Sequence, residues 1–342
     1  MSNIKQVAIE ANVSPSTVSR VLNNYDNVTE ETRIKVEKAC KKLNYKPNAA
    51  AAHLRSGKTS TISFVVPEIN NPYFAKALKG VENLAIDKGF KTIVCNTNNN
   101  FDMEKKYMEM IIEKSVDGLI LATTNSKTEE YNWIYNYSIP VVLFDRKIYE
   151  LDNKVDLVAG DSYKGAYKLT NHLIKMGHKN VGILTAPLNI STSKERLQGY
   201  KDALSNNNIK INTDWIWISQ EGKGYDPQLA FELTNNKISE LRNMPEAFFV
   251  GNNLMALGMF KSLTKNNLKV PEDVAIACFD DLNFSFEINP FFTSMKQPSY
   301  KMGQKAAEIL IRKIENKDKN YIESIFDSKL YIRQSSKKTF NN

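Results

Sequence analysis

Apolar residues in the first 45 positions recur three and four places apart, the spacing of helical stripes. They form three groups: Ile4, Val7, Ala8 and Ala11; Val18, Val21 and Leu22; and Val36, Ala39, Cys40 and Leu43. Each group follows a residue favoured at helix N-caps, namely Asn3, Ser14 and Thr29. Pro15 stands at the first position of the second group, where a missing N–H costs nothing. The pattern predicts three short helices with a tight turn between the first two.

The second predicted helix exposes small hydroxyls and one arginine on its outer face: Ser16, Thr17, Ser19 and Arg20. Such a helix after a tight turn is typical of a helix-turn-helix unit. The N-terminal part of a recognition helix lies in the major groove, where hydroxyls allow close approach and an arginine can bond N7 and O6 of a guanine. The spacing alone also fits a three-helix protein-binding module.

From Thr61 onward, short apolar runs rich in β-branched residues alternate with helical stretches. The runs are TISFVV, KTIVCN, DGLILA and PVVLF, then DLVAG, NVGILT, EAFFVG and VAIACF. Fully apolar strands between helices imply parallel sheets covered on both faces. Eight such strands favour two doubly wound α/β lobes, although the rhythm alone also permits one closed barrel.

Charge supports a polyanionic partner for the first part of the chain. The protein has 342 residues and a net charge of +8. Residues 1–60 carry ten basic against five acidic side chains, so more than half of the excess lies in under a fifth of the chain. A local basic excess is typical of nucleic-acid binding, and also of some solvated protein faces.

Several functional classes find no support. The three cysteines and three histidines are scattered, which argues against disulfides, a metal site or a bound cofactor. The segment GKTS at 57–60 lacks the glycine that a phosphate loop needs at position 52, where Ala52 stands. Neither a signal peptide nor a membrane-spanning apolar run is present, and we therefore expect a cytoplasmic protein.

The stretches IKQVAIEANVSPSTVSRVLNN and VTEETRIKVEKACKKLNYKPN resemble the DNA-binding headpiece of the LacI/GalR family. The resemblance implies base reading by Pro15, Ser16 and Arg20, although Pro15 offers no side-chain hydrogen bond. It implies backbone contacts by Thr17, Ser19 and Asn23. Asn3 and Ser14 complete the headpiece residues that we expect at the DNA.

Residues 47–58, PNAAAAHLRSGK, have high helix propensity but are too few for a stable isolated helix. By itself the segment fits an interdomain linker. By the same resemblance it is a hinge helix that folds in the minor groove, with DNA contacts at Asn48 and Ala51 and a wedge at Leu54. Ala52 departs from the basic residue that relatives often carry.

Polar and aromatic residues follow the predicted strands of the core, where open α/β folds bind ligands. Aromatic faces together with carboxylate, amide and guanidinium groups suit a sugar. The core resembles type I periplasmic sugar-binding proteins, and most closely the ribose-binding type. The resemblance implies ligand contacts at Asn71, Tyr73, Phe74, Asp145, Arg146, Arg196, Asn252, Asp280 and Gln297. Tyr225 is a looser match, and Asn253 and Cys278 replace an aspartate and a glycine.

We therefore expect an α/β protein with an N-terminal three-helix helix-turn-helix headpiece and a two-lobed, doubly wound parallel-sheet core. The expected boundaries are 1–46 for the headpiece, 47–60 for the hinge and 61–342 for the core. Within the core, the N-lobe spans about 61–160 and 292–322, and the C-lobe about 161–291 and 323–342. The expected function is a homodimeric transcriptional regulator, expected to be a repressor, of a near-palindromic operator. We expect control by a ribose-like pentose, or else by a hexose or sugar acid.

Three alternatives remain. A catabolite regulator would take a phosphorylated carrier protein as corepressor, but Glu308 stands where that class uses an arginine. A sugar-active enzyme would need paired carboxylates, and Asp280–Asp281 are adjacent in sequence, an arrangement that rarely points both groups into one site. The third alternative is a core that binds no ligand.

Overall fold

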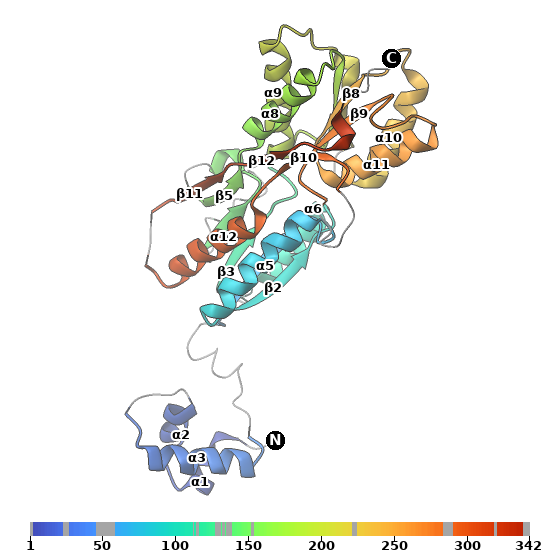
Figure 1. The fold of residues 1–342 in the computed structure, drawn as a ribbon. Helices are drawn as coiled ribbons and strands as arrows, with labels where there is room; N and C mark the ends of the chain where they lie inside the picture. The colour runs from blue at the N-terminus through green and yellow to red at the C-terminus, as the bar shows by residue number, and fades with distance from the viewer. Residues whose placement is uncertain are drawn as a thin grey trace. The chain divides into compact units, whose positions relative to one another are not determined.

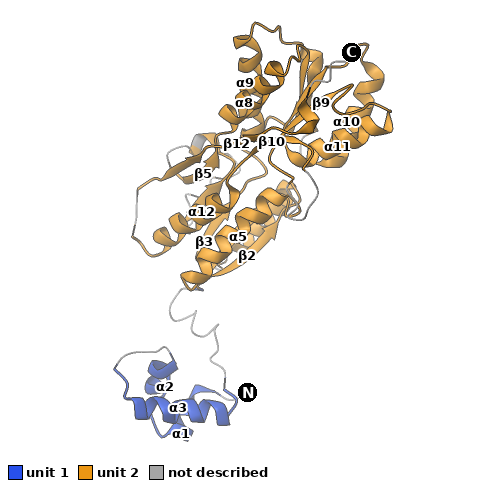
Figure 2. Ribbon diagram, viewed as in Figure 1, with its two compact units in different colours: residues 1–59 blue, residues 60–342 orange. Residues whose placement is uncertain are grey.

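The computed structural model divides into two compact units, residues 1–59 and residues 60–342 (Figures 1 and 2). The residues that the structure describes are 3–22, 27–45, 59–111, 113, 116–126, 131, 134, 139–151, 154–220, 224–282, 290–317 and 320–337. No helix within these ranges is long and apolar enough to cross a membrane.

The first unit contains the predicted helices α1 (Ile4–Ala11), α2 (Pro15–Leu22) and α3 (Glu30–Lys42). All three predicted caps form. The Asn3 side chain accepts the N–H of Gln6, and the Ser14 and Thr29 hydroxyls accept the N–H groups of the residues three places on. The predicted apolar stripes meet in one small core, in which the side chains of the three helices are buried together.

The second unit contains two six-stranded sheets, and we call the first sheet with its helices the N-lobe. The N-lobe sheet has the order β11-β5-β4-β3-β1-β2 with parallel pairing throughout. Its strands are β1 (Thr61–Val66), β2 (Lys91–Asn96), β3 (Gly118–Leu121), β4 (Val141–Phe144), β5 (Asp156–Gly160) and β11 (Glu323–Phe326). The parallel register aligns the carboxyl ends of these strands at one edge.

The second sheet, that of the C-lobe, has the order β12-β10-β9-β8-β6-β7 and is parallel except for the β10–β12 pair. Its strands are β6 (Val181–Thr185), β7 (Ile216–Ile218), β8 (Ala247–Val250), β9 (Ala275–Phe279), β10 (Thr293–Lys296) and β12 (Lys329–Tyr331). Two open sheets confirm the doubly wound lobes and rule out the closed barrel.

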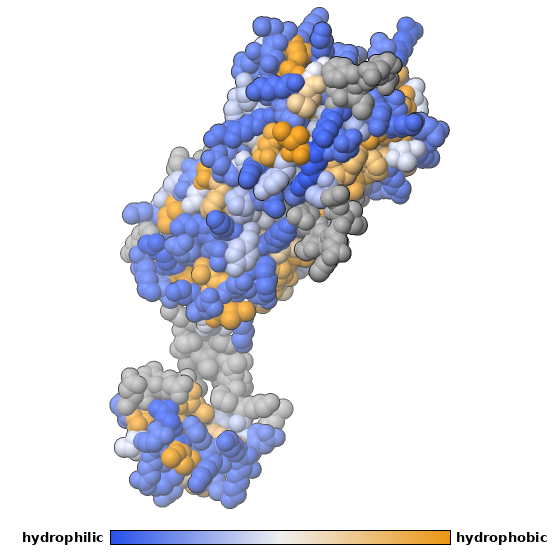
Figure 3. All heavy atoms as spheres, in the orientation of Figure 1, coloured by the Kyte–Doolittle hydropathy of each residue, from blue (hydrophilic) through white to orange (hydrophobic). Residues whose placement is uncertain are grey.

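Helices cover both faces of each sheet (Figure 1). In the N-lobe one face packs against α5 (Pro72–Asp87) and α12 (Ser299–Ile314), and the other against α6 (Phe101–Met110). In the C-lobe the covering helices are α8 (Ser162–Lys175), α9 (Ser191–Asn206), α10 (Pro227–Glu240) and α11 (Asn253–Lys265). Short 3-10 helices lie at η3 (Tyr149–Leu151), η4 (Thr213–Trp215) and η5 (Gln334–Ser336). The core surface visible in Figure 3 is mainly hydrophilic, with hydrophobic side chains in small separate groups.

The chain crosses between the lobes after β5, after β10 and after β11. Two predicted lobe boundaries therefore move. β10 pairs with β9 and belongs to the C-lobe, although 292–322 was expected in the N-lobe. β11 pairs with β5 and belongs to the N-lobe, although 323–342 was expected in the C-lobe. Each strand still pairs within the sheet of one lobe, and the chain passes to the other lobe only after the strand ends. Their sequences, TSMK and ESIF, lack a continuous apolar run that would have predicted them.

All eight predicted strands form, whereas β7, β10, β11 and β12 were not predicted. Most of the missed strands lie at sheet edges or crossings, where strands are short and partly exposed. β2 was expected to be covered on both faces. It is an edge strand instead, and its Ile93 and Val94 side chains are each 39% exposed.

Helices α5 and α12 approach each other closely through two glycines. A Cβ atom at Gly303 would overlap the carbonyl oxygen of Ala77 in α5, and one at Gly80 would overlap the carbonyl oxygen of Tyr300 in α12. Because the overlapping atoms belong to the backbone, a Cβ atom fits at either position only if the two helices move apart. The N-lobe core depends on this contact, because Ala77 and Met302 are both fully buried beside it.

We expect Gly303→Ala to lower the free energy of unfolding by about 1–3 kcal/mol, because overpacking forces the helices apart. Thermal melts of the full-length protein measure the effect. Lys301→Ala, an exposed position on the same helix, is the matched control and should change stability by less than about 0.5 kcal/mol. Equal melting temperatures for the two variants would contradict the close helix contact.

Candidate functional site

The first turn of α2 presents a cluster of hydroxyl groups. The Ser14 hydroxyl accepts the Thr17 N–H at 3.1 Å and lies 2.7 Å from the Ser16 hydroxyl and 2.9 Å from that of Thr17. The opposite face of α2 buries Val18 and Val21. The helix is therefore held by its apolar face while its polar face remains outside.

Of the seven predicted DNA contacts that the structure describes, five are exposed. Asn3, Ser14, Pro15, Ser16 and Arg20 are exposed, and Thr17 and Ser19 are partly buried. Asn3 also forms a capping box with Gln6, so part of its bonding capacity is structural. The remaining predicted contacts, Asn23, Asn48, Ala51 and Leu54, lie outside the described residues.

The ten predicted effector-binding residues are all buried, with exposed fractions of 2–7%. They are Asn71, Tyr73, Phe74, Asp145, Arg146, Arg196, Tyr225, Asn252, Asp280 and Gln297. Two of them have clear structural roles. Phe74 packs with Tyr73 and Phe144 in the N-lobe core, and Asn252 caps α11 by accepting the Met255 N–H at 2.8 Å.

The N-lobe half of the site forms where β1 and β4 end. Asn71 caps α5 by accepting the Tyr73 N–H at 3.0 Å. The Tyr73 hydroxyl then donates to Asp145 Oδ1 at 2.8 Å. Arg146 donates from Nη1 to the carbonyl oxygen of Thr123 at 2.7 Å, and its Nε lies 4.0 Å from Asp145 Oδ2.

The C-lobe half is organised around Tyr225. Its hydroxyl lies 3.0 Å from that of Thr192 and accepts from Ser193 at 2.9 Å and from Arg196 Nη1 at 3.3 Å. Arg196 also donates to the Gly251 carbonyl at 2.6 Å. The halves meet at the Tyr225 ring, whose centroid is 5.5 Å from the Arg196 guanidinium carbon and 5.7 Å from that of Arg146.

Two aspartates adopt left-handed backbone conformations directly after buried strands. Asp145 has φ of 66° and Asp280 has φ of 62°. Such conformations are uncommon outside glycine and cluster at functional sites. Asp280 accepts a bond from Gln297 Nε2 at 2.9 Å. Burial raises the pKa of the Asp280 carboxyl to about 6, with Asp145 adding to the rise and Arg196 opposing it.

Three buried polar atoms of this site have no hydrogen-bond partner among the described residues: Arg146 Nε, Arg196 Nε and Gln297 Oε1. An unpaired buried donor or acceptor costs about 1–3 kcal/mol, and more when the group is charged. Burial also lowers the pKa of Arg146. Two unpaired donors and one unpaired acceptor are groups that a ligand with several hydroxyl groups can satisfy.

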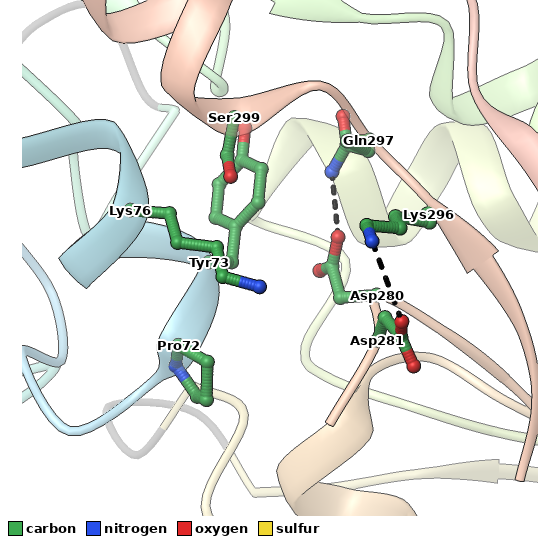
Figure 4. Close-up of a pocket in the computed structure, with 8 residues that line it drawn as sticks. All are labelled: Pro72, Tyr73, Lys76, Asp280, Asp281, Lys296, Gln297 and Ser299. Atoms are coloured by element: carbon green, nitrogen blue, oxygen red, sulfur yellow. Dashed lines mark hydrogen bonds and ion pairs between the residues drawn. The ribbon is translucent and has the colours of Figure 1, made fainter. Parts of the chain in front are cut away.

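A small pocket of about 20 Å³ opens beside Asp280, lined from both lobes (Figure 4). Lys76 of α5 and Lys296 of β10 both reach toward the two aspartates in this view. Lys296 Nζ lies 3.9 Å from Asp281 Oδ2, and Arg333 bonds both oxygens of Asp281 at 2.9 and 3.2 Å. The volume holds about one water molecule.

The two adjacent carboxylates therefore bind different partners, because Asp280 accepts a hydrogen bond from Gln297 and Asp281 accepts from Arg333. They do not form the pair that acid–base catalysis on one substrate would require. No group of three metal-ligating side chains occurs in the part of the chain that the structure describes.

Sequence reasoning missed several residues that connect the lobes. Asn253, noted only as a departure, donates from Nδ2 to Asn71 Oδ1 at 3.2 Å and to the Asp281 carbonyl at 3.3 Å. Ser191 at the start of α9 contacts Ser126 of the N-lobe. The hydroxyl-rich segment STS at 191–193 was the available signal. Cys278, the other departure, is fully buried in the C-lobe core.

Two family models match the chain. Residues 3–48 match the model described as bacterial regulatory proteins, lacI family. Residues 59–334 match the periplasmic binding proteins and sugar binding domain of the LacI family. Together they span both units of the structure.

Curated relatives agree over nearly the whole length. The HTH-type transcriptional repressor PurR of Mannheimia succiniciproducens is 34% identical over 339 residues, which is 99% of each chain. That of Aliivibrio salmonicida is 35% identical over 334 residues, 96% of each chain. These relatives are transcriptional repressors, which agrees with the expectation that the protein is not an enzyme.

Solved structures show the same fold. A complex of the transcriptional regulator CelR with cellobiose is 25% identical, covers 98% of this chain and 100% of its own, and has a TM-score of 0.73. A LacI family transcriptional regulator from Enterococcus faecium with bound ribose is 25% identical over 80% and 98%, with a TM-score of 0.68. The lac repressor dimer bound to operator has a TM-score of 0.82 at 22% identity over 98% and 99%. The chain belongs to the LacI family of DNA-binding transcriptional repressors, with a helix-turn-helix headpiece and an effector core of the sugar-binding type.

Proposed function

We propose that this repressor binds a near-palindromic operator as a dimer and is controlled by a ribose-like pentose held between the lobes of its core. The observation that carries the effector assignment is the set of unpaired buried atoms on Arg146, Arg196 and Gln297. A pentose supplies hydroxyl groups that both donate and accept, so one such ligand satisfies all three atoms. Its apolar ring face suits an aromatic side chain such as that of Tyr225.

The charge of the site favours a neutral sugar over a sugar acid. The guanidinium groups of Arg146 and Arg196 are buried together with the carboxylates of Asp145 and Asp280, and Arg146 Nε lies 4.0 Å from Asp145 Oδ2. A ligand carboxylate would add a third buried negative charge beside those two aspartates, which is costly in a low dielectric. The solved relative with bound ribose supports the pentose class, with hexoses and sugar acids as the next candidates.

Control by the effector requires different affinities of the sugar for the two functional states. The lobes are joined across the cleft by the Asn253–Asn71 bond and by Ser126–Ser191, contacts that a bound pentose would reinforce. A sugar that alters operator binding must itself be bound more tightly or more weakly by the operator complex, by the same factor. Weaker operator binding in the presence of sugar is induction, and tighter binding is corepression.

A second copy of the chain fits the exposed edge of the N-lobe. Strand β2 ends the sheet, so its outer backbone groups are unpaired with another strand of this sheet, and its Ile93 and Val94 side chains are partly exposed. Two linked headpieces would read two half-sites, which raises effective concentration and predicts an operator of about 14–20 base pairs. The hinge contacts Asn48, Ala51 and Leu54 remain part of this proposal.

A phosphoprotein corepressor is the weaker alternative. Glu308 on α12 lies 3.0 Å from Lys305 and 3.8 Å from Arg312, so its carboxylate already occupies both cations. A phosphorylated partner would have to displace it against like-charge repulsion. The observation in favour of the phosphoprotein alternative is the similarity to the solved transcription regulator CcpA of Lactococcus lactis, which is 25% identical.

Arg20→Ala should weaken specific operator binding by about 1–3 kcal/mol while non-specific binding changes much less, because a bidentate guanine contact is lost. The operator is first selected from a random library, and anisotropy titrations then compare it with a scrambled duplex at matched salt. Arg20→Lys is the control that keeps the charge but not the bidentate geometry, and should also lose specificity. An Arg20→Ala protein that still discriminates as the wild type does would disprove this role.

Arg146→Ala should abolish stabilisation by D-ribose and leave operator binding intact. A native-state ligand at a hundredfold excess over its Kd adds about 2.7 kcal/mol of apparent stability, which thermal-shift assays detect readily. Arg312→Ala, an exposed arginine on α12, is the control and should respond as the wild type does. A full shift in Arg146→Ala, or a flat profile for the wild type across pentoses, hexoses and sugar acids, speaks against the proposal.

Ribose affinity should fall with acidification below about pH 6. The buried Asp280 has a raised pKa of about 6, and its ionised form is the better acceptor for a sugar hydroxyl. Ionisation is nearly complete above that pH, and each pH unit below it should raise the Kd by about tenfold. Calorimetry at pH 5 and pH 7.5 measures this, with Asp280→Asn expected to bind weakly and without pH dependence. Equal Kd values at both pH values in the wild type would exclude an ionised Asp280 as the acceptor.

A further inference from the structure

Glu104 is a buried carboxylate outside the predicted effector contacts. It lies on α6 with no exposed surface. Its oxygens accept bonds from the Tyr131 hydroxyl at 2.6 Å, the Thr124 N–H at 2.7 Å and the Thr123 hydroxyl at 3.2 Å. Two of these donors belong to the loop of residues 123–126, so the carboxylate fixes the start of that loop.

The start of the loop positions Arg146. The carbonyl oxygen of Thr123 accepts the Arg146 Nη1 bond at 2.7 Å. The guanidinium therefore takes its direction from a carbonyl whose own residue and next neighbour are held by Glu104. The Nε atom of the same guanidinium is buried and has no hydrogen-bond partner among the described residues.

The end of the same loop reaches the other lobe. The Ser126 N–H donates to the Asn189 carbonyl at 2.9 Å, and the Ser126 hydroxyl accepts the Ser191 N–H at 3.0 Å. Ser191 is the first residue of α9, whose own N-cap, Ile190, forms no side-chain cap. A hydroxyl of the N-lobe thus caps a helix of the C-lobe.

That helix carries the second arginine of the site, Arg196. A return contact runs the other way, because the Ser191 hydroxyl accepts the N–H of Lys147, the residue after Arg146, at 2.8 Å. The loop and the start of α9 therefore form one hydrogen-bonded connection between the two arginines. Its fixed end in the N-lobe is the carboxylate of Glu104.

We propose that Glu104 is a positioning residue for effector binding. Through the 123–126 loop it fixes the orientation of Arg146 and positions the Ser126 hydroxyl that caps α9. One buried carboxylate thereby orients both Arg146 and Arg196. The inference rests on the proposed effector function for its consequence in binding. Without Glu104 a smaller fraction of molecules holds the competent arrangement, and the apparent Kd rises in inverse proportion to that fraction.

Calorimetric titration of the full-length protein with D-ribose tests the effect on affinity. Glu104→Ala should raise the Kd by about tenfold, and Glu104→Gln by less, because the amide retains one acceptor oxygen. Glu109→Gln, an exposed position on the same helix, is the matched control and should leave the Kd unchanged. An unaltered Kd in Glu104→Ala would overturn the inference.

A double-mutant cycle tests the path. Ser126→Ala removes the cross-lobe cap and should also raise the Kd. Both residues act through one loop, so their effects should overlap. The increase in ribose Kd in the Glu104→Gln/Ser126→Ala protein should be smaller than the product of the two increases measured in the single variants. Strictly additive free energies would show that Glu104 does not act through Ser126, and would refute the proposed connection.

Hydrogen exchange in the absence of sugar separates this inference from the proposed function. In Glu104→Gln the Ser191 amide, in the opposite lobe, should exchange faster than in the wild type and in Glu109→Gln, while amides at the far end of α9 are unchanged. A wild type that binds no pentose would defeat the effector proposal, yet this readout would still decide the role of Glu104. Unchanged exchange at Ser191 would overturn that role.

Discussion

The structure depends on the burial of two arginines between two facing lobes. Arg146 and Arg196 are each 2% exposed, and each leaves its Nε without a hydrogen-bond partner among the described residues. Bringing such groups out of water is unfavourable unless new partners replace the water. Nη1 of Arg146 donates to the Thr123 carbonyl, and Nη1 of Arg196 donates to the Gly251 carbonyl and the Tyr225 hydroxyl, which fixes the directions of both guanidinium groups. In the proposed function, a hydroxyl-rich ligand supplies the missing partners, and its binding energy would help to hold the lobes together.

The fold explains how so few residues define the site. Parallel strands deliver their carboxyl ends to one edge of each sheet, and the chain leaves β4 and β9 through aspartates in left-handed conformations. Helix caps fix other members, because Asn71 and Asn252 each begin a helix at the same edge. Hydrogen bonds also join the two lobes directly, from Ser191 to Ser126 and from Asn253 to Asn71. Any effect of the sugar on the operator is a difference in affinity between two states of this assembly, and it must be reciprocal.

Much of this was predictable from sequence because the signals are local. The caps Asn3, Ser14 and Thr29 and the eight continuous apolar runs each follow from neighbouring residues. The strands β10 and β11 were missed because they form through pairing with distant strands where the chain crosses between the lobes. Their short, partly polar sequences carry no local strand signal. The site residues came mainly from family resemblance. What sequence did not reveal were contacts between distant segments, such as Ser126 with Ser191 and Glu104 with the 123–126 loop, which have no periodic or spacing signature.

The central claim is that sugar in the core and operator at the headpiece are energetically coupled. Its most direct test is the operator Kd of the full-length protein, measured by fluorescence anisotropy with and without saturating D-ribose at fixed salt. Coupling of the two sites should change the operator Kd by about 5–150-fold, and the ribose Kd by an equal factor when operator is present. Ribose that binds the free protein but leaves the operator Kd unchanged would show that the two sites are not coupled.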